Sequence, residues 1–204
     1  FQQEYPQIAI DLISIDDRGE LGEKGIDVLI RGRGTRQRGG ARSEPQGLVA
    51  RKLFQSKYAV AASQEYLNRA AAPRTPADLL QHSCIAHVSL EHDVGDEWEF
   101  VKSTERQKIK FPPKLRIQGV DAVCEAGIAG CGVISLLAAS IEDELRSRKL
   151  VAVLPDWERT GARPILAIYR KTVPVVPQVN AFVRYLVDAY RRYDLADRRR
   201  KEGH

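Results

Sequence analysis

The segment that most constrains the fold is 115–137, which contains two strand patterns and one helix pattern joined by short links. Residues 115–118 alternate between apolar and polar side chains, as in a half-buried strand. A helical spacing of apolar residues follows, with Asp121 as its expected N-cap. Residues 133–137 are an apolar run of strand length. Because two strands joined through a helix run parallel when they share a sheet, the segment predicts a βαβ crossover unit.

A βαβ unit is compatible with two roles. In open α/β sheets, ligands bind where a strand ends and the N-terminus of the next helix begins, because backbone N–H groups and the helix dipole point there. The same unit also serves as ordinary core without any ligand. The spacing of residues in 115–137 does not distinguish the two roles, so both stay open at this point.

The length of 204 residues allows one large domain or two small lobes. Hydrophobic residues make up 43% and charged residues 29%, as in a globular protein, and the net charge of +5 favours anionic partners. No apolar run is long enough to span a membrane, and no signal peptide is recognisable. Since the chain starts at Phe1 and contains no methionine, we expect it to be a piece of a longer polypeptide.

The three cysteines lack the spacing of a metal or redox site, which fits a reducing, cytoplasmic setting. Cys124 and Cys131 are expected to be buried in the core. The histidines His82, His87 and His92 recur every five residues, a spacing that neither a helix nor a strand brings onto one face, so no metal site is expected. Neither a nucleophile elbow nor a phosphate-binding loop is present. We therefore expect no enzyme, no catalytic residue and no cofactor.

Strands and helices alternate along the chain, which predicts an α/β fold. The strands of the first sheet are expected to come from two parts of the chain, one ending near Ala62 and the other beginning near Pro164. Two lobes joined by two crossing strands are therefore expected, with a cleft between them. Strands are expected over 8–15, 26–30, 48–54, 58–62, 84–88, 98–101, 107–111, 150–154 and 164–169, and helices over 19–24, 64–71, 76–80, 140–148 and 178–190. Residues 191–204 carry six lysines and arginines without an apolar period and are expected to form a disordered tail.

Residues 31–47 contain five arginines and five glycines. Such a loop suits contact with nucleic-acid phosphates, but Gly-rich loops are more commonly solvated surface loops, and this one lacks the interleaved aromatic residues of many nucleic-acid binders. Both interpretations stay open.

Several segments in order along 1–187 resemble the regulatory domain of LysR-type transcriptional regulators. The first is 21–31, LGEKGIDVLIR. The others are 48–53 (LVARKL), 60–67 (VAASQEYL), 73–79 (PRTPADL), 82–85 (HSCI), 98–100 (WEF), 129–133 (AGCGV) and 150–157, which ends in VLPDW. Two departures are visible: the loop 31–47 is longer and more basic than in the family, and Leu137 stands where many members have proline.

The resemblance implies two Rossmann-like lobes similar to type 2 periplasmic binding proteins. The first lobe would comprise 1–62 with 165–190, without its first strand and most of the following helix, and the second would comprise 63–164. The whole regulator would bind DNA through an N-terminal winged helix-turn-helix, which is absent from this chain. It would form homodimers or homotetramers through the first lobe, with the helices at 17–24 and 178–190 as the expected contact faces. A periplasmic solute-binding protein of the same fold is the alternative.

The resemblance also implies an effector site in the cleft between the lobes. The expected effector-binding residues are Ile30, Arg31, Gly32, Ala62, Ser63, Gln118, Gly119, Val120, Ser135 and Leu136. Backbone N–H groups at 119–121 and the Arg31 guanidinium would suit a small carboxylate. A solvated loop arginine is the equally open interpretation of Arg31, because four more arginines follow it in the same loop.

Overall fold

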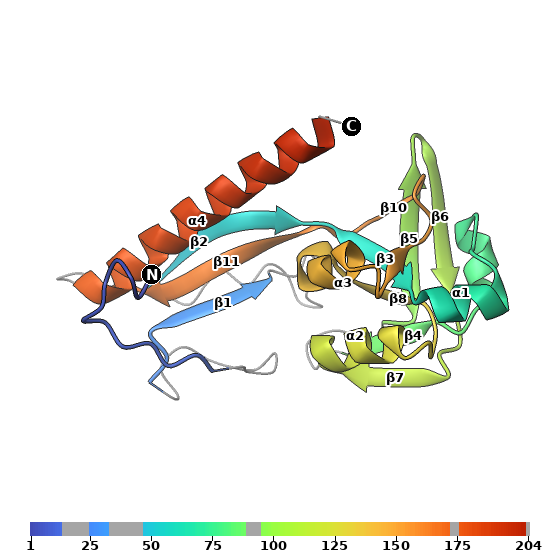
Figure 1. Ribbon diagram of the computed structural model, residues 1–204, viewed down its shortest axis with the longest axis horizontal. Coiled ribbons are helices and arrows are strands. Elements are labelled where there is room, and N and C mark those ends of the chain that lie inside the picture. Colours follow the sequence, from blue (N-terminus) through green and yellow to red (C-terminus); the bar gives the residue numbers. More distant parts are fainter. Residues whose placement is uncertain (14–24, 33–46, 89–94, 172–175, 203–204) are drawn as a thin grey trace. The chain divides into compact units, whose positions relative to one another are not determined.

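The chain folds into two compact α/β units, one comprising Phe1–Gln55 with Arg163–His204 and the other Ser56–Ala162. A computed structural model describes residues 1–13, 25–32, 47–88, 95–171 and 176–202, with side chains up to residue 192. Figure 1 shows the elements in sequence colours. The expected helix over 19–24 and most of the basic loop 31–47 lie outside the described residues.

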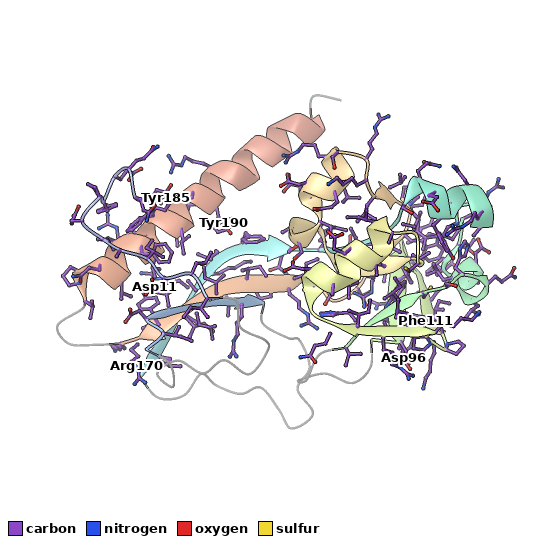
Figure 2. The ribbon with its side chains drawn as sticks, turned by 60° about the horizontal axis from the view of Figure 1, so that its bottom comes forward. Asp11, Asp96, Phe111, Arg170, Tyr185 and Tyr190 are labelled. Carbon is purple, nitrogen blue, oxygen red and sulfur yellow. The ribbon has the colours of Figure 1, made fainter. Side chains whose placement is uncertain are left out.

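Unit 1 contains a three-stranded sheet in the order β1 (Val28–Gly32), β11 (Arg163–Arg170), β2 (Leu48–Ser56). Strand β1 is antiparallel to β11, with Gly32 opposite Ile165. Helix α4 (Pro177–Glu202) packs on this sheet through Val183, which is buried in one cluster with Leu53 and Ala167 (Figure 1). Farther along α4, the ring of Tyr190, labelled in Figure 2, stacks on Phe54 of β2 at a centroid distance of 4.5 Å.

The centre of unit 2 consists of parallel and antiparallel strands. They are β3 (Tyr58–Ala62), β4 (Ile85–Val88), β7 (Leu115–Gln118), β8 (Ile134–Leu137) and β9 (Val151–Ala152). Strand β4 is parallel to β7, and a parallel bridge between Cys84 and Val133 aligns β4 with β8. Strand β3 is antiparallel to β8 and β9. Strands β7 and β8 therefore run in the same direction on either side of β4, which confirms the crossover predicted from 115–137.

Two hydrophobic clusters cover the opposite faces of these strands. Helix α2 (Val120–Ile128) packs on one face, where its Val123 is buried with Ile134 and Leu136. The other face holds Val60 and Val133 together with residues of the antiparallel sheet β10 (Glu158–Arg159), β5 (Glu97–Lys102), β6 (Glu105–Lys110). The remaining helices are α1 (Gln64–Ala70), α3 (Glu142–Arg146) and the 3-10 turns η1 (Pro76–Gln81) and η2 (Ala138–Ser140).

The open end of the predicted β5–β6 hairpin is closed by a backbone contact. Asp96 and Phe111 lie side by side there (Figure 2), and the Phe111 N–H donates to the Asp96 carbonyl at 3.0 Å. The Phe111 ring packs edge-on against Trp98 at a centroid distance of 4.8 Å. The antiparallel pairing expected between 98–101 and 107–111 is confirmed. The paired residues are 97–102 and 105–110.

Three local predictions are wrong. Residues 8–13, expected to begin a strand, form none, and Leu12 is 91% exposed. Their alternation suits a strand, but no described strand pairs with them. Helix α4 continues to Glu202, so the backbone of 191–202 is helical rather than disordered. Asp121 does not cap α2, because Gly119 turns the chain with φ of 93° and the helix begins at Val120.

The predicted boundaries of the lobes also differ from those of the two units. The chain enters unit 2 between Gln55 and Ser56 and leaves it between Ala162 and Arg163. The whole of β3 pairs with β8 and β9, so this strand belongs to unit 2. The prediction had placed it in the first lobe, which was expected to extend to residue 62. The predicted α/β fold with two units is confirmed, and its crossings lie at 55/56 and 162/163.

Candidate functional site

Unit 2 has one edge at which its two crossings and its parallel strand ends come together. Strand β3 begins at Tyr58, two residues after the chain enters the unit, and Tyr58 lies opposite Leu137 at the carboxyl end of β8. Strands β4 and β7 run parallel to β8, so their carboxyl ends lie at the same edge. We call this the crossing edge of unit 2.

Three predicted site residues lie at this edge, where β7 passes into α2. Gln118 is exposed, and Gly119 and Val120 are half-buried. The first N–H groups of α2 have no partner within the helix, and the helix dipole gives this end a partial positive charge. A Cβ placed on Gly119 would meet no atom within 4 Å, so the space beside this backbone is open. Asp121 lies in the first helical turn and adds an opposing negative charge there.

The two predicted residues on β8 have different surroundings because side chains alternate along a strand. Leu136 is 2% exposed and packs in the cluster beneath α2, so its side chain belongs to the core. Ser135 points to the opposite face, where it lies across from Val60. Ser135 is 6% exposed, and its Oγ has no hydrogen-bond partner within the described residues. Leaving a buried hydroxyl without a hydrogen bond costs about 1–3 kcal/mol. Such unsatisfied groups are rare in native cores.

Ala62 and Ser63 do not join this group. They lie at the far end of β3, where Ala62 pairs with Val151, so the prediction that they are near a crossing is wrong. Ala62 is fully buried, and the Ser63 Oγ accepts the Tyr66 N–H at 3.2 Å as the N-cap of α1. The Ser63 cap is confirmed, and it accounts for this side chain without a ligand.

Ile30, Arg31 and Gly32 lie at the corresponding edge of unit 1. They end β1, and Gly32 is opposite Ile165, close to the point at which the chain returns from unit 2 at Arg163. Ile30 is 41% exposed, and Arg31 is exposed. Each unit therefore places its predicted residues, apart from Ala62 and Ser63, at the edge through which the crossings pass.

Two residues at the crossing edge of unit 2 were not predicted. The guanidinium of Arg159 lies 3.9 Å from the centroid of the Tyr58 ring and 5.5 Å from that of Trp98. Tyr58 was recognisable as the first residue of the strand predicted over 58–62. Arg159 was not, because residues 155–162 contain no strand pattern and β10 is only two residues long.

Two thiols of unit 2 have perturbed pKa values. Burial raises the pKa of the Cys84 thiol to about 12 and that of Cys124 to about 11, so neither suits a nucleophile. Cys131 is exposed, and its predicted burial is therefore wrong. In the part of the chain that the structure describes, no three His, Cys, Asp or Glu side chains cluster as metal ligands would. None of the helices found there is long and apolar enough to cross a bilayer.

A family model described as the LysR substrate binding domain matches residues 1–191. The HTH-type transcriptional regulator CrgA of Neisseria meningitidis is 24% identical over 92% of this chain and 59% of CrgA. The HTH-type transcriptional repressor PA14_22550 of Pseudomonas aeruginosa is 29% identical over 93% of this chain and 57% of the repressor. The chain thus spans somewhat more than half the length of these curated relatives. The solved regulatory domain of CrgA has the same fold, with a TM-score of 0.78 at 23% identity, covering 93% of this chain and 87% of that domain.

Proposed function

The chain belongs to the LysR substrate-binding domain family, and we propose that it is the effector-sensing part of a bacterial transcriptional regulator that acts in the cytoplasm. The relatives that it matches are named as regulators and a repressor of transcription. In this proposal the domain binds a small molecule and catalyses no reaction. The buried Ser135 hydroxyl at the crossing edge of unit 2 carries the proposal, because a bound ligand would satisfy it.

The proposed effector is a small carboxylate, bound by residues at the crossing edge of unit 2 and at the corresponding edge of unit 1. Unit 2 would contribute the N–H groups at Gly119 and Val120 and the side chains of Gln118 and Ser135. Unit 1 would contribute the end of β1, with Arg31 as a cation for the carboxylate. Ala62, Ser63 and the side chain of Leu136 are left out of this set, because their contacts are with the core of unit 2.

Binding at both edges would couple effector concentration to the arrangement of the units. A ligand that binds a closed arrangement more tightly than an open one shifts the population towards the closed one. In a homodimer or homotetramer this shift would change the spacing of the DNA-reading domains. DNA contact itself would come from the helix-turn-helix part of the whole protein.

A periplasmic solute-binding protein with the same fold is the second candidate. The family match favours the regulator, because the matching relatives are named as HTH-type regulators. The two candidates differ in what the gene encodes before residue 1. A helix-turn-helix there supports the regulator, whereas a signal peptide or a lipid-anchored cysteine supports the solute-binding protein.

A thermal-shift screen tests the proposed effector class. Small aromatic and aliphatic acids would be compared with their uncharged amides, which match them in size. We expect at least one acid, and not its amide, to raise the melting temperature by several degrees, since a ligand at 100 times its Kd adds about 2.7 kcal/mol of stability. Arg31→Ala should reduce this shift. If no acid stabilises the domain, and Arg31→Ala leaves the full-length regulator unchanged, the carboxylate effector is contradicted.

A further inference from the structure

We propose that the last part of helix α4, residues 191–202, binds the phosphate backbone of double-stranded DNA through arginines on one of its faces. We call this part the basic end of α4. The proposal goes beyond effector sensing and rests on the proposed function in one respect, that a transcriptional regulator works on DNA. The family model ends at residue 191, so nearly all of the basic end lies outside the family match.

The side chains that hold α4 on the sheet of unit 1 end at Tyr190. Val183, Val187 and Tyr190 recur at helical spacing and pack in one cluster with the sheet. Among the described side chains, none after Tyr190 joins this cluster. At the same spacing the stripe would continue through Asp194 and Asp197, and an apolar core excludes unpaired charges of this kind. Figure 1 shows this end of α4 running away from strand β2.

The arginines of the basic end recur two helical turns apart. Arg191 and Arg192 are followed seven residues later by Arg198 and Arg199, so the four positions share one face of α4. The two pairs lie about 10.5 Å apart along the helix axis. Arg191 and Arg192 are exposed. Their face lies away from the stripe that packs on the sheet, whereas the acidic positions that continue the stripe fall on its side of the helix.

The basic end has an excess of positive charge. It contains six lysines and arginines and three aspartates and glutamates, which gives a net charge of +3. Arg191 lies 4.0 Å from Asp188, and the two side chains are 74% and 65% exposed. Exposed ion pairs contribute only about 0–1 kcal/mol, so a phosphate can replace Asp188 as the partner of this guanidinium at little cost.

Double-stranded DNA fits this face better than a membrane surface does. Guanidinium groups bind phosphates through two parallel hydrogen bonds, and the neutralisation of DNA phosphates releases counterions. A helix that lies on a membrane needs a broad apolar face, whereas the apolar residues of the basic end are Tyr193, Leu195 and Ala196. Since phosphate contacts carry no sequence information, the expected binding does not depend on base sequence.

Fluorescence anisotropy of a labelled duplex tests the proposal, with about 20 base pairs of arbitrary sequence and salt between about 50 and 200 mM. The test variant combines Arg191→Gln, Arg192→Gln, Arg198→Gln and Arg199→Gln, because glutamine keeps the helix propensity of arginine. The control variant makes the same change of net charge by substituting glutamine for four exposed basic residues of unit 2, which are Lys110, Lys114, Arg116 and Lys149.

We expect the wild-type chain to bind the duplex with a strong salt dependence, since each phosphate contact adds about 0.9 to the slope of log K against log salt. The test variant should lose about 2–4 from this slope and bind at least about tenfold more weakly at low salt. The control variant should stay within about twofold of the wild type, because its substitutions lie outside the proposed face.

The proposal is overturned if the wild-type chain does not bind the duplex at low salt, or if both variants lose affinity equally. Binding to phosphatidylserine vesicles that depends on the four arginines, without binding to the duplex, would assign the face to a membrane surface instead. Duplex binding requires no effector, so a failed acid screen would contradict effector sensing and leave this face intact. Conversely, an acid that stabilises the domain, with equal duplex binding by wild type and test variant, would leave effector sensing intact and overturn the DNA-binding face.

Discussion

The Tyr66 hydroxyl lies 3.1 Å from Nδ1 of His82 and accepts the backbone N–H of Ser83 at 2.9 Å. A hydroxyl has one proton to donate and two lone pairs that accept, so the Tyr66 hydroxyl can serve Ser83 and His82 at the same time. Burial lowers the pKa of His82 below its ordinary value of 6.5, partly opposed by the charge of Asp78. The link ties helix α1 to the turn that precedes β4.

Folding stability should therefore fall when the solution becomes acidic. Because the pKa of His82 is lower in the folded state, the unfolded chain binds the proton more tightly. The stabilisation is fully present above the ordinary pKa of 6.5 and is lost as the pH falls from that value through the lowered one. Urea unfolding at about pH 7.5 and about pH 5.5 measures the loss. His82→Asn, which keeps an acceptor but does not titrate, should show a smaller loss; equal losses in both proteins would assign the acid sensitivity to other groups.

Ser63 and Ser135, two of the buried serines of unit 2, should respond in opposite ways to substitution by alanine. Ser135→Ala removes a hydroxyl without a partner, so the unligated protein should keep or gain stability, by up to about 1 kcal/mol. Ser63→Ala removes the N-cap of α1 and should cost about 1 kcal/mol. Only Ser135→Ala should weaken binding of the stabilising acid. Paired denaturation and titration of both variants measure this, and destabilisation by Ser135→Ala would show that its hydroxyl has a structural partner.

Gly132 should not tolerate a side chain. A Cβ at this position would overlap the backbone carbonyl oxygen of Ser83, which accepts the N–H of the adjacent Val133 at 2.8 Å. Gly132→Ala should therefore lower the free energy of unfolding by about 3 kcal/mol or more. Gly119→Ala is the control, because its Cβ would meet open space and only the positive φ of 93° opposes it, at about 1–2 kcal/mol. Thermal unfolding ranks the two, and a smaller effect at Gly132 would contradict the close approach to Ser83.

Thiol reactivity should separate the three cysteines. Cys131 is exposed, whereas Cys84 and Cys124 are buried with the pKa raised to about 12 and about 11. A chromogenic disulfide reagent should therefore titrate one thiol rapidly in the native protein and the others only after denaturation. Cys131→Ser should abolish the rapid phase. Rapid reaction of a second thiol would mean that the core of unit 2 opens readily.

Features set by neighbouring residues were predictable from the sequence. The Ser63 cap, the hairpin over 97–110 and the crossover of 115–137 depend on short-range patterns, and all three are present. Features set by distant partners were not. Residues 8–13 have the alternation of a strand without a described strand to pair with, and β3 joins unit 2 because of its contacts with β8 and β9. The position of Arg159 was not predictable for the same reason, since it depends on contacts with β5 and Tyr58.

The most direct test of effector binding is to map the backbone amide resonances that shift when the most stabilising acid is added. We predict that the largest shifts fall in the proposed contact residues at the crossing edge of unit 2 and the corresponding edge of unit 1, which are 30–32, 118–120 and 135, and that the uncharged amide of the same acid leaves them unchanged. Shifts confined to residues away from both edges, such as those around the Ser63 cap of α1, would contradict a site built from the crossing edges.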